Sequence, residues 1–258
     1  MLIQITNRCH MFCPHCMQNA NPRGKQMTEE TFAQVLDFVC KAKPLVLSVT
    51  GGEPTENPLW MAYIRALLDL PSKPIVNILT NGAWIEDSET RISMARLIRG
   101  AKGRLNVQVY SNPKYYRDHD WTVEHESQFR SIGCIPDFTD TIFMQDLGRA
   151  RKNCMEETEK SDHVPSCINS HLIAMQASSL PHFLLIAAQV GKFCRPLIDT
   201  EGSIHMSESW LCPSVAHVRD GIGEAFRKMR LSRPCKGCRL YKNFELLHPK
   251  EMELLFKR

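Results

Sequence analysis

The feature that most constrains the fold is an alternation of apolar and amphipathic segments over the first 111 residues. Strand-like apolar runs are expected at 2–6, 45–50, 75–80 and 105–111. Between them, apolar residues recur at helical spacing over 29–42, 58–69 and 87–99. Thr28 is placed to cap the first of these helices. This alternation predicts an α/β fold with a parallel sheet covered by helices.

Beyond residue 111 the alternation weakens. We expect a strand at 140–146, a polar connection over 153–166 and a helix from about 176 to 191. From Cys194 the sequence predicts a hairpin that turns at Glu201-Gly202, followed by a helix over about 219–231. The prediction therefore divides the chain near residue 190. Residues 1–190 form the main domain and 191–258 form a small cysteine-bearing module.

Length and composition narrow the classes of function. The 258 residues, 43% of them hydrophobic, are enough for a sizeable core. No signal peptide or membrane-length apolar run is visible, so we expect a soluble, cytoplasmic protein with no membrane contact. In that compartment the 11 cysteines suggest metal ligation before disulfides. Residues 227–242 carry seven Lys/Arg and no Asp/Glu, which suits either an anionic partner such as nucleic acid or a solvated surface.

Three cysteines directly follow the first expected strand. Cys9, Cys13 and Cys16 have the spacing Cys-x3-Cys-x2-Cys. A structural zinc site would need a fourth ligand, for which His10 and His15 are candidates. A [4Fe–4S] cluster held by three thiolates would instead keep one iron open. The three cysteines alone leave both interpretations standing.

Further motifs stand at the ends of the later strands. Gly51-Gly52-Glu53-Pro54 follows the second strand, Asn81 the third, and Ser111 ends the fourth. Gly148-Arg149-Ala150 follows the strand expected at 140–146. Barrel enzymes collect their active-site loops at this edge of the sheet. Two glycines allow a close backbone approach, and the Glu53 carboxylate suits an ammonium group.

With these motifs in order, the sequence resembles the radical S-adenosylmethionine (radical SAM) superfamily. The resemblance implies a partial (β/α)6 TIM-like barrel in which SAM chelates the open iron. An electron delivered by a reductant such as flavodoxin or ferredoxin then cleaves SAM, and the 5′-deoxyadenosyl radical abstracts hydrogen from a substrate. The resemblance also implies the following SAM-binding residues: His15, Gly51, Gly52, Glu53, Pro54, Asn81, Ser111 and Arg149.

A second set of cysteines lies late in the chain. Cys194, Cys212, Cys235 and Cys238 have the spacing Cys-x17-Cys-x22-Cys-x2-Cys, which can fill a [4Fe–4S] cluster or hold zinc. In the superfamily context this pattern resembles the Twitch form of the SPASM auxiliary-cluster domain. It implies a second [4Fe–4S] cluster.

No catalytic acid or base is marked in the sequence. Cys154 and Cys167 are candidate hydrogen donors to a substrate radical, and structural thiols are the simpler interpretation of both. The leading hypothesis for function is oxidative or radical modification of a peptide or protein, as in a maturase of ribosomal peptides. With no room before Cys9 for a leader-binding domain, such a substrate is expected either to need a separate leader-peptide-binding protein or to need no recognition partner.

Three alternatives stand beside that hypothesis: a small-molecule dehydrogenase of natural-product biosynthesis, an RNA-modifying enzyme, and a non-enzymatic zinc-binding module.

Overall fold

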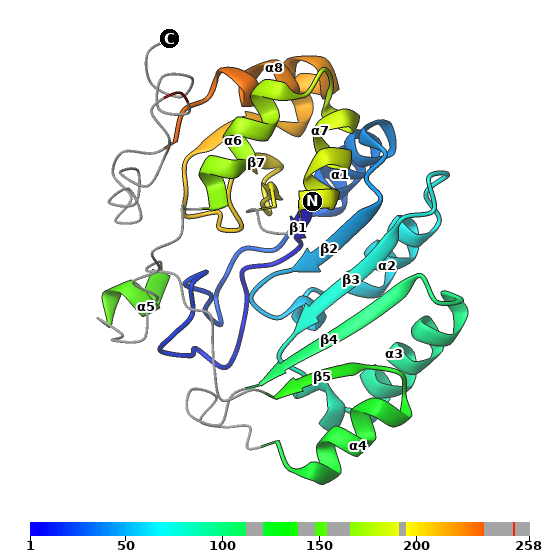
Figure 1. Cartoon of the computed structure of the whole chain (residues 1–258). Helices are drawn as coiled ribbons and strands as arrows, with labels where there is room; N and C mark the ends of the chain where they lie inside the picture. Colours follow the sequence, from blue (N-terminus) through cyan, green and yellow to red (C-terminus); the bar gives the residue numbers. More distant parts are fainter. Residues whose placement is uncertain (112–120, 139–147, 154–165, 191–194, 235–249, 251–258) are drawn as a thin grey trace.

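The computed structural model describes residues 1–111, 121–138, 148–153, 166–190, 195–234 and 250 (Figure 1). These residues form one open eight-stranded sheet with the strand order β5-β4-β3-β2-β1-β6-β7-β8. Strands β1 to β5 run parallel, and β6 pairs in parallel with β1. Strand β7 then pairs antiparallel with β6, and β8 pairs antiparallel with β7. The predicted α/β fold class is therefore confirmed, as a mostly parallel sheet that is not closed.

The bounds of the elements follow in chain order. The strands are β1 Leu2–Gln4, β2 Val46–Thr50, β3 Ile75–Thr80, β4 Leu105–Ser111, β5 Ile135–Phe138, β6 Leu197–Ile198, β7 Ser203–His205 and β8 Ser214–His217. The helices are α1 Glu29–Ala42, α2 Trp60–Leu68, α3 Ser88–Gly100, α4 Val123–Ser131, α5 Gly148–Lys152, α6 Ser166–Gln176, α7 Leu180–Val190 and α8 Gly221–Leu231. Three short 3₁₀ helices, η1 Pro54–Glu56, η2 Ala83–Glu86 and η3 Val218–Asp220, follow strand ends.

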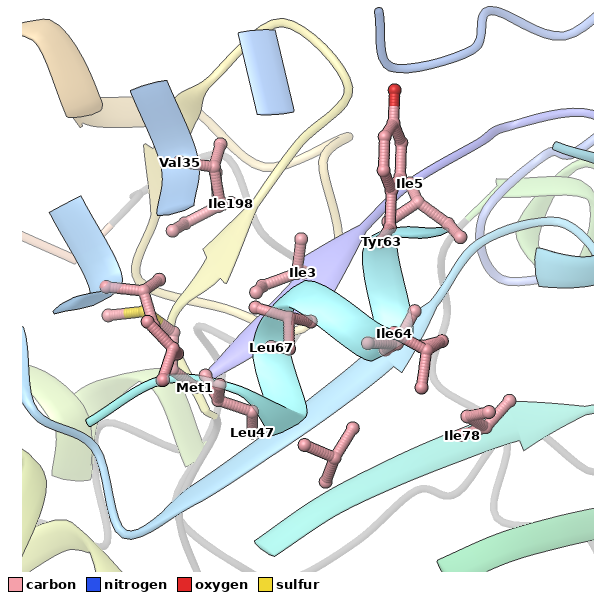
Figure 2. Packing of buried hydrophobic residues seen from close by; sticks show 14 of the residues in the cluster. Met1, Ile3, Ile5, Val35, Leu47, Tyr63, Ile64, Leu67, Ile78 and Ile198 are labelled. Carbon is pink, nitrogen blue, oxygen red and sulfur yellow. The ribbon is translucent and has the colours of Figure 1, made fainter. Parts of the chain in front are cut away.

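The two faces of the parallel sheet differ sharply in polarity. Register places Ile3 beside Val49 and Ile78 beside Val107, and all four side chains are fully buried in the main core. Helices α1 and α2 cover this face, where the side chains of Val35, Tyr63, Ile64 and Leu67 meet those of the strands (Figure 2). The opposite face carries neutral polar side chains in adjacent strands: Gln4, Ser48, Thr50, Asn77, Asn106 and Gln108.

Most elements of the first 111 residues match the sequence-based prediction. Helix α1 spans the expected residues, and the Thr28 side chain caps it by accepting from the Thr31 N–H at 3.2 Å. The strand predictions at 75–80 and 105–111 coincide with β3 and β4. The predicted hairpin is also present: Asp199 accepts hydrogen bonds from Glu201 and Ser203, and Gly202 takes a positive φ of 87°.

The prediction is incomplete beyond residue 111. Helix α4 was not predicted, because Phe129 is its one buried apolar side chain and gives no helical periodicity. The single helix expected at 176–191 is confirmed only as α7, and α6 begins within the stretch expected as a polar connection. The strand expected at 140–146 lies outside the described residues.

The hairpin β6–β7 extends the main sheet through its pairing with β1. The division of the chain at residue 190 stays a prediction. Within the described parts of the chain, no helix is long and apolar enough to cross a membrane.

Candidate functional site

The three cysteines after β1 lie on one irregular loop, Cys9–Ala20, which we call the cysteine loop. Cys9 is 8% exposed and packs with Met11 and Ala20 in a small cluster of its own. Cys13 and Cys16 pack against that cluster. Turn hydrogen bonds hold the loop internally, from the Cys16 N–H to the Cys13 carbonyl at 3.2 Å and from the Ala20 N–H to the Cys16 Sγ at 3.4 Å.

The histidines near these thiols have other roles. His10 Nδ1 lies 2.6 Å from Glu56, whose carboxylate also accepts the His10 backbone N–H at 2.8 Å. His15 is 8% exposed, and its burial, together with the nearby Arg149 charge, lowers its pKa to about 4. His15 is therefore neutral at neutral pH. In the part of the chain that the structure describes, no three His, Cys, Asp or Glu side chains converge as ligands of a single metal ion.

Arg149 binds the cysteine loop through its backbone carbonyls. Its guanidinium Nε donates to the Cys13 carbonyl at 2.8 Å, and its backbone N–H donates to the Cys16 carbonyl at 2.9 Å. The guanidinium also lies 4.0 Å from the centre of the Phe12 ring. Arg149 is only 6% exposed, so these contacts are sheltered from water. The guanidinium thus holds the loop, and the SAM contact that the resemblance implies for Arg149 stays a prediction.

Helix α5, which carries Arg149, packs closely on this loop (Figure 1). Gly148 has a φ of 58°, and a Cβ there would lie 2.5 Å from the Met17 carbonyl oxygen. Asn153 Nδ2 donates to the Pro14 carbonyl at 2.8 Å. Sequence reasoning missed Asn153, because its target is a backbone carbonyl with no signature of its own.

The two glycines after β2 allow close contact with the first cysteine. A Cβ on Gly52 would lie 2.2 Å from the Arg8 carbonyl oxygen and 2.8 Å from the Cys9 Cβ. A Cβ on Gly51 would lie 2.6 Å from the Thr6 carbonyl oxygen. The Gly52 N–H donates to that Thr6 carbonyl at 2.9 Å. The glycines thus allow the segment that follows β1 to approach closely, and their role toward SAM stays a prediction.

Glu53 joins the ends of β2 and β3. Its carboxylate is 1% exposed and accepts hydrogen bonds from the Thr80 hydroxyl at 2.8 Å, the Asn81 N–H at 2.9 Å and the Thr55 hydroxyl at 2.8 Å. Burial raises the pKa of Glu53, and these donors oppose that shift. Pro54 opens η1, with Glu53 as its N-cap. The Glu53 carboxylate thus accepts hydrogen bonds from three residues, and its predicted contact with an ammonium group stays a prediction.

The Thr80 hydroxyl extends this hydrogen-bond chain. Its oxygen accepts from the Gly82 N–H and from the Trp84 indole N–H, both at 3.0 Å, so its single proton goes to Glu53. Asn81 is 8% exposed, and its Nδ2 lies 3.8 Å from the Cys9 Sγ. Ser111 ends β4 and is 5% exposed, whereas the preceding Tyr110 lies on the other face of the strand and is exposed. Glu53, Asn81 and Cys9 are therefore brought together at one edge of the sheet.

The second set of cysteines is described only in part. Cys194, Cys235 and Cys238 lie outside the described residues, as does Cys154. Cys167 lies in α6, and its side chain is outside the described part. The Cys212 Sγ accepts from the Ser207 hydroxyl at 3.0 Å, and the Cys212 carbonyl lies 2.6 Å from His205 Nδ1.

The residues present fit a cluster held by three thiolates. They supply three thiols on one loop, and His10 is engaged by Glu56 instead of pointing to a fourth ligand position. Burial, followed by smaller repulsion from Glu53 and Glu56, raises the pKa of the metal-free Cys9 thiol to about 12. Loading this site with metal therefore displaces a proton.

Comparison with known proteins finds a family model that matches the part of the chain carrying the three cysteines. The model of the radical SAM superfamily matches residues 3–130. The PqqA peptide cyclase of Ruegeria pomeroyi is 22% identical over 193 residues, which are 74% of this chain and 44% of that protein. The GTP 3',8-cyclase of Streptomyces coelicolor is 20% identical over 152 residues, 56% of this chain and 45% of that protein. The chain spans less than half the length of these curated relatives.

Solved structures share the fold. The anSMEcpe structure with bound AdoMet gives a TM-score of 0.52 at 12% identity, covering 98% of both chains. BtrN in complex with AdoMet and 2-DOIA gives 0.51 at 9% identity, covering 89% of this chain and 84% of that chain. Streptococcus suis SuiB bound to the precursor peptide SuiA gives 0.51 at 14% identity, covering 93% and 69%. At these identities the likeness establishes the fold.

Proposed function

The chain belongs, through residues 3–130, to the radical SAM superfamily, and from this premise we propose that it modifies a peptide or protein by hydrogen abstraction. The observation that carries the proposal is the cysteine loop itself, with Cys9, Cys13 and Cys16 on one loop beside Gly52 and Asn81. When bound, a [4Fe–4S] cluster with one open iron supplies the electron that cleaves SAM to methionine and the 5′-deoxyadenosyl radical.

The chain's own residues would bind and orient the two cofactors. The thiolates of Cys9, Cys13 and Cys16 would hold the cluster. Arg149 would keep the backbone from Cys13 to Cys16 in place through its hydrogen bonds to both carbonyls. SAM is proposed to lie along the strand ends that carry Gly51-Gly52-Glu53-Pro54, Asn81 and Ser111. The neutral, buried ring of His15 suits contact with an adenine better than a charged ring would.

A peptide substrate is favoured over a small molecule. The PqqA peptide cyclase covers 74% of this chain, against 56% for the GTP 3',8-cyclase of Streptomyces coelicolor, and SuiB was solved with a precursor peptide. The small-molecule alternative is supported by the fold shared with BtrN. A separate leader-binding protein and a flavodoxin or ferredoxin reductant belong to the proposal.

We also propose that residues 191–258 form an auxiliary module. Cys194, Cys212, Cys235 and Cys238 would hold a second [4Fe–4S] cluster that accepts an electron from the substrate radical or holds the substrate. The support is the position of Cys212 just after the predicted hairpin, on a loop held by Ser207 and His205. Cys154 and Cys167 stay candidate hydrogen donors.

Anaerobic purification followed by metal analysis tests the cofactor assignment. About four iron and four sulfide per chain support the first cluster, and about eight of each support both. Cys13→Ala should abolish release of 5′-deoxyadenosine with dithionite and SAM, whereas Cys40→Ala, in α1, should not. Colourless protein that contains zinc would overturn the proposal in favour of the zinc-module alternative.

Substrate class is tested separately. The short peptide encoded nearest the gene is synthesised with deuterated side chains and incubated with the reduced enzyme and SAM. Deuterium in 5′-deoxyadenosine supports peptide modification. Cys235→Ala should spare much of the SAM cleavage and stop product formation. Tight, salt-dependent RNA binding in place of peptide turnover would favour the RNA-modifying alternative.

A further inference from the structure

A second contact holds the cysteine loop at the end opposite Cys9. Gln18 lies two residues after Cys16, and its side-chain Nε2 donates to the Glu208 carbonyl at 2.6 Å. In return, the Trp210 indole N–H donates to the Gln18 carbonyl at 3.0 Å. The two hydrogen bonds run in opposite directions and join residues that are 190 and 192 positions apart in sequence. Together they restrain both the backbone and the side chain of Gln18.

The segment that holds Gln18 is itself tightly hydrogen-bonded. We call Ser207–Cys212 the brace segment. Ser209 is 2% exposed; its N–H donates to the Ser207 hydroxyl at 3.1 Å, and its own hydroxyl accepts from the Leu211 N–H at 3.2 Å. The Cys212 N–H donates to the Ser209 carbonyl at 3.2 Å. These bonds close the segment into a compact loop.

The brace segment is also tied to the sheet. The Glu208 carboxylate pairs with the Arg195 guanidinium at 3.2 Å, and that guanidinium donates to the Ser48 hydroxyl at 3.0 Å. Ser48 lies fully buried in β2, on the polar face of the sheet. The position of Gln18 is therefore fixed, through the brace segment and Arg195, relative to the central strand β2. The cysteine loop has no helix or strand of its own to provide such support.

We propose that Trp210 and Gln18 are positioning residues for Cys16, because their hydrogen bonds attach the cysteine loop to the brace segment. The inference rests on the proposed function insofar as Cys16 is a cluster ligand. The contact is indirect: Gln18 is followed by Asn19, whose N–H donates to the Cys16 carbonyl at 3.3 Å. Loss of the indole N–H frees the Gln18 carbonyl and loosens the turn that carries the Cys16 thiol.

The first test uses the metal-free, reduced protein. Alkylation of Cys16 by iodoacetamide is timed by peptide mass spectrometry, with Cys40 as an internal reference. Trp210→Phe keeps an aromatic ring and removes the donor, so Cys16 should react about fivefold faster than in the wild type. Trp60→Phe is the matched control, because Trp60 is 7% exposed in α2 and packs in the main core. It reports any general loss of stability.

The second test uses the reconstituted cluster. The electron paramagnetic resonance spectrum of the reduced protein should change on adding SAM in the wild type and in Trp60→Phe, and change differently in Trp210→Phe. Gln18→Met, which removes the side-chain amide and with it the donor to the Glu208 carbonyl, serves if Trp210→Phe fails to fold. Equal alkylation rates and identical spectra in Trp210→Phe and Trp60→Phe would overturn the inference. If the wild type assembles no cluster, the proposed function fails, and the alkylation rates still decide the brace.

Discussion

Replacing Glu53 by Gln tests whether its carboxylate joins β2 to β3. Both oxygens of this carboxylate accept hydrogen bonds in the described structure. The donors are the Thr80 hydroxyl, the Asn81 N–H, and the N–H and hydroxyl of Thr55. A glutamine keeps one acceptor oxygen and places an amide NH2 group at the other position. With its oxygen toward Thr55, its NH2 faces the Asn81 N–H; with its oxygen toward Asn81, its NH2 faces both donors of Thr55.

The cost of Glu53→Gln follows from this count. One hydrogen bond to a charged group is lost, at about 1.5–3 kcal/mol, and one buried donor is left unpaired, at about 1–3 kcal/mol. Burial raises the Glu53 pKa, so removing the charge recovers part of this loss. We expect a net decrease of about 2–4 kcal/mol in the free energy of unfolding, a large part of the stability of an ordinary domain.

Urea titration followed by circular dichroism measures this difference. The control is Glu126→Gln, which removes an exposed pair with Arg130 in α4 and should cost less than about 1 kcal/mol. The m-value should be the same in all three proteins, so that the shift in midpoint reports stability. Equal midpoints for Glu53→Gln and Glu126→Gln would refute the role assigned to Glu53.

Three further changes test other parts of the structure. Burial lowers the pKa of His171 in α6 from 6.5 to about 4. The free energy of unfolding should therefore be constant with respect to this group above pH 6.5 and fall by up to about 3 kcal/mol toward pH 4. Urea titrations measure this loss, which His171→Leu should remove. Gly82→Ala places a Cβ 2.6 Å from Val109 Cγ1 at a φ of 79°, and should lower the free energy of unfolding by about 2–4 kcal/mol. Urea titration measures this loss, and in the same titrations Gly100→Ala, with open space around it, should be neutral or stabilising. Arg149→Lys should cost about 1–3 kcal/mol in urea titrations because a lysine cannot replace the guanidinium contacts, whereas a result equal to that of the exposed Arg151→Lys would contradict the loop-holding role.

The parts of the fold that sequence predicted well are those with local signals. Helix α1 has apolar residues on one face and a capping threonine before it, and both signals are confirmed. Helix α4 lacks the first signal, and the capping contact between Thr122 and His125 at its start does not have the Ser/Thr-x-x-Glu/Gln sequence pattern. Helix α6 was not predicted, although the predicted polar connection ends at residue 166, where the helix begins.

The candidate site divides in the same way. The spacing of Cys9, Cys13 and Cys16 predicted a shared loop, and the glycines after β2 predicted a close approach. The partners of Arg149 and Trp210 are backbone carbonyls, which carry no residue-type signal in sequence. Their roles depend on which distant segments the fold brings together, and a single sequence does not contain that information.

The pairing of β1 with β6 has a consequence for synthesis of the chain. Leu2 pairs with Ser48 on one side and with Leu197 on the other. While the ribosome has not yet delivered residue 197, one edge of β1 carries backbone groups without their final partners. Exposed strand edges of this kind template association between chains. The emerging protein is therefore most prone to aggregation, and most in need of a chaperone, until its late hairpin pairs with its first strand.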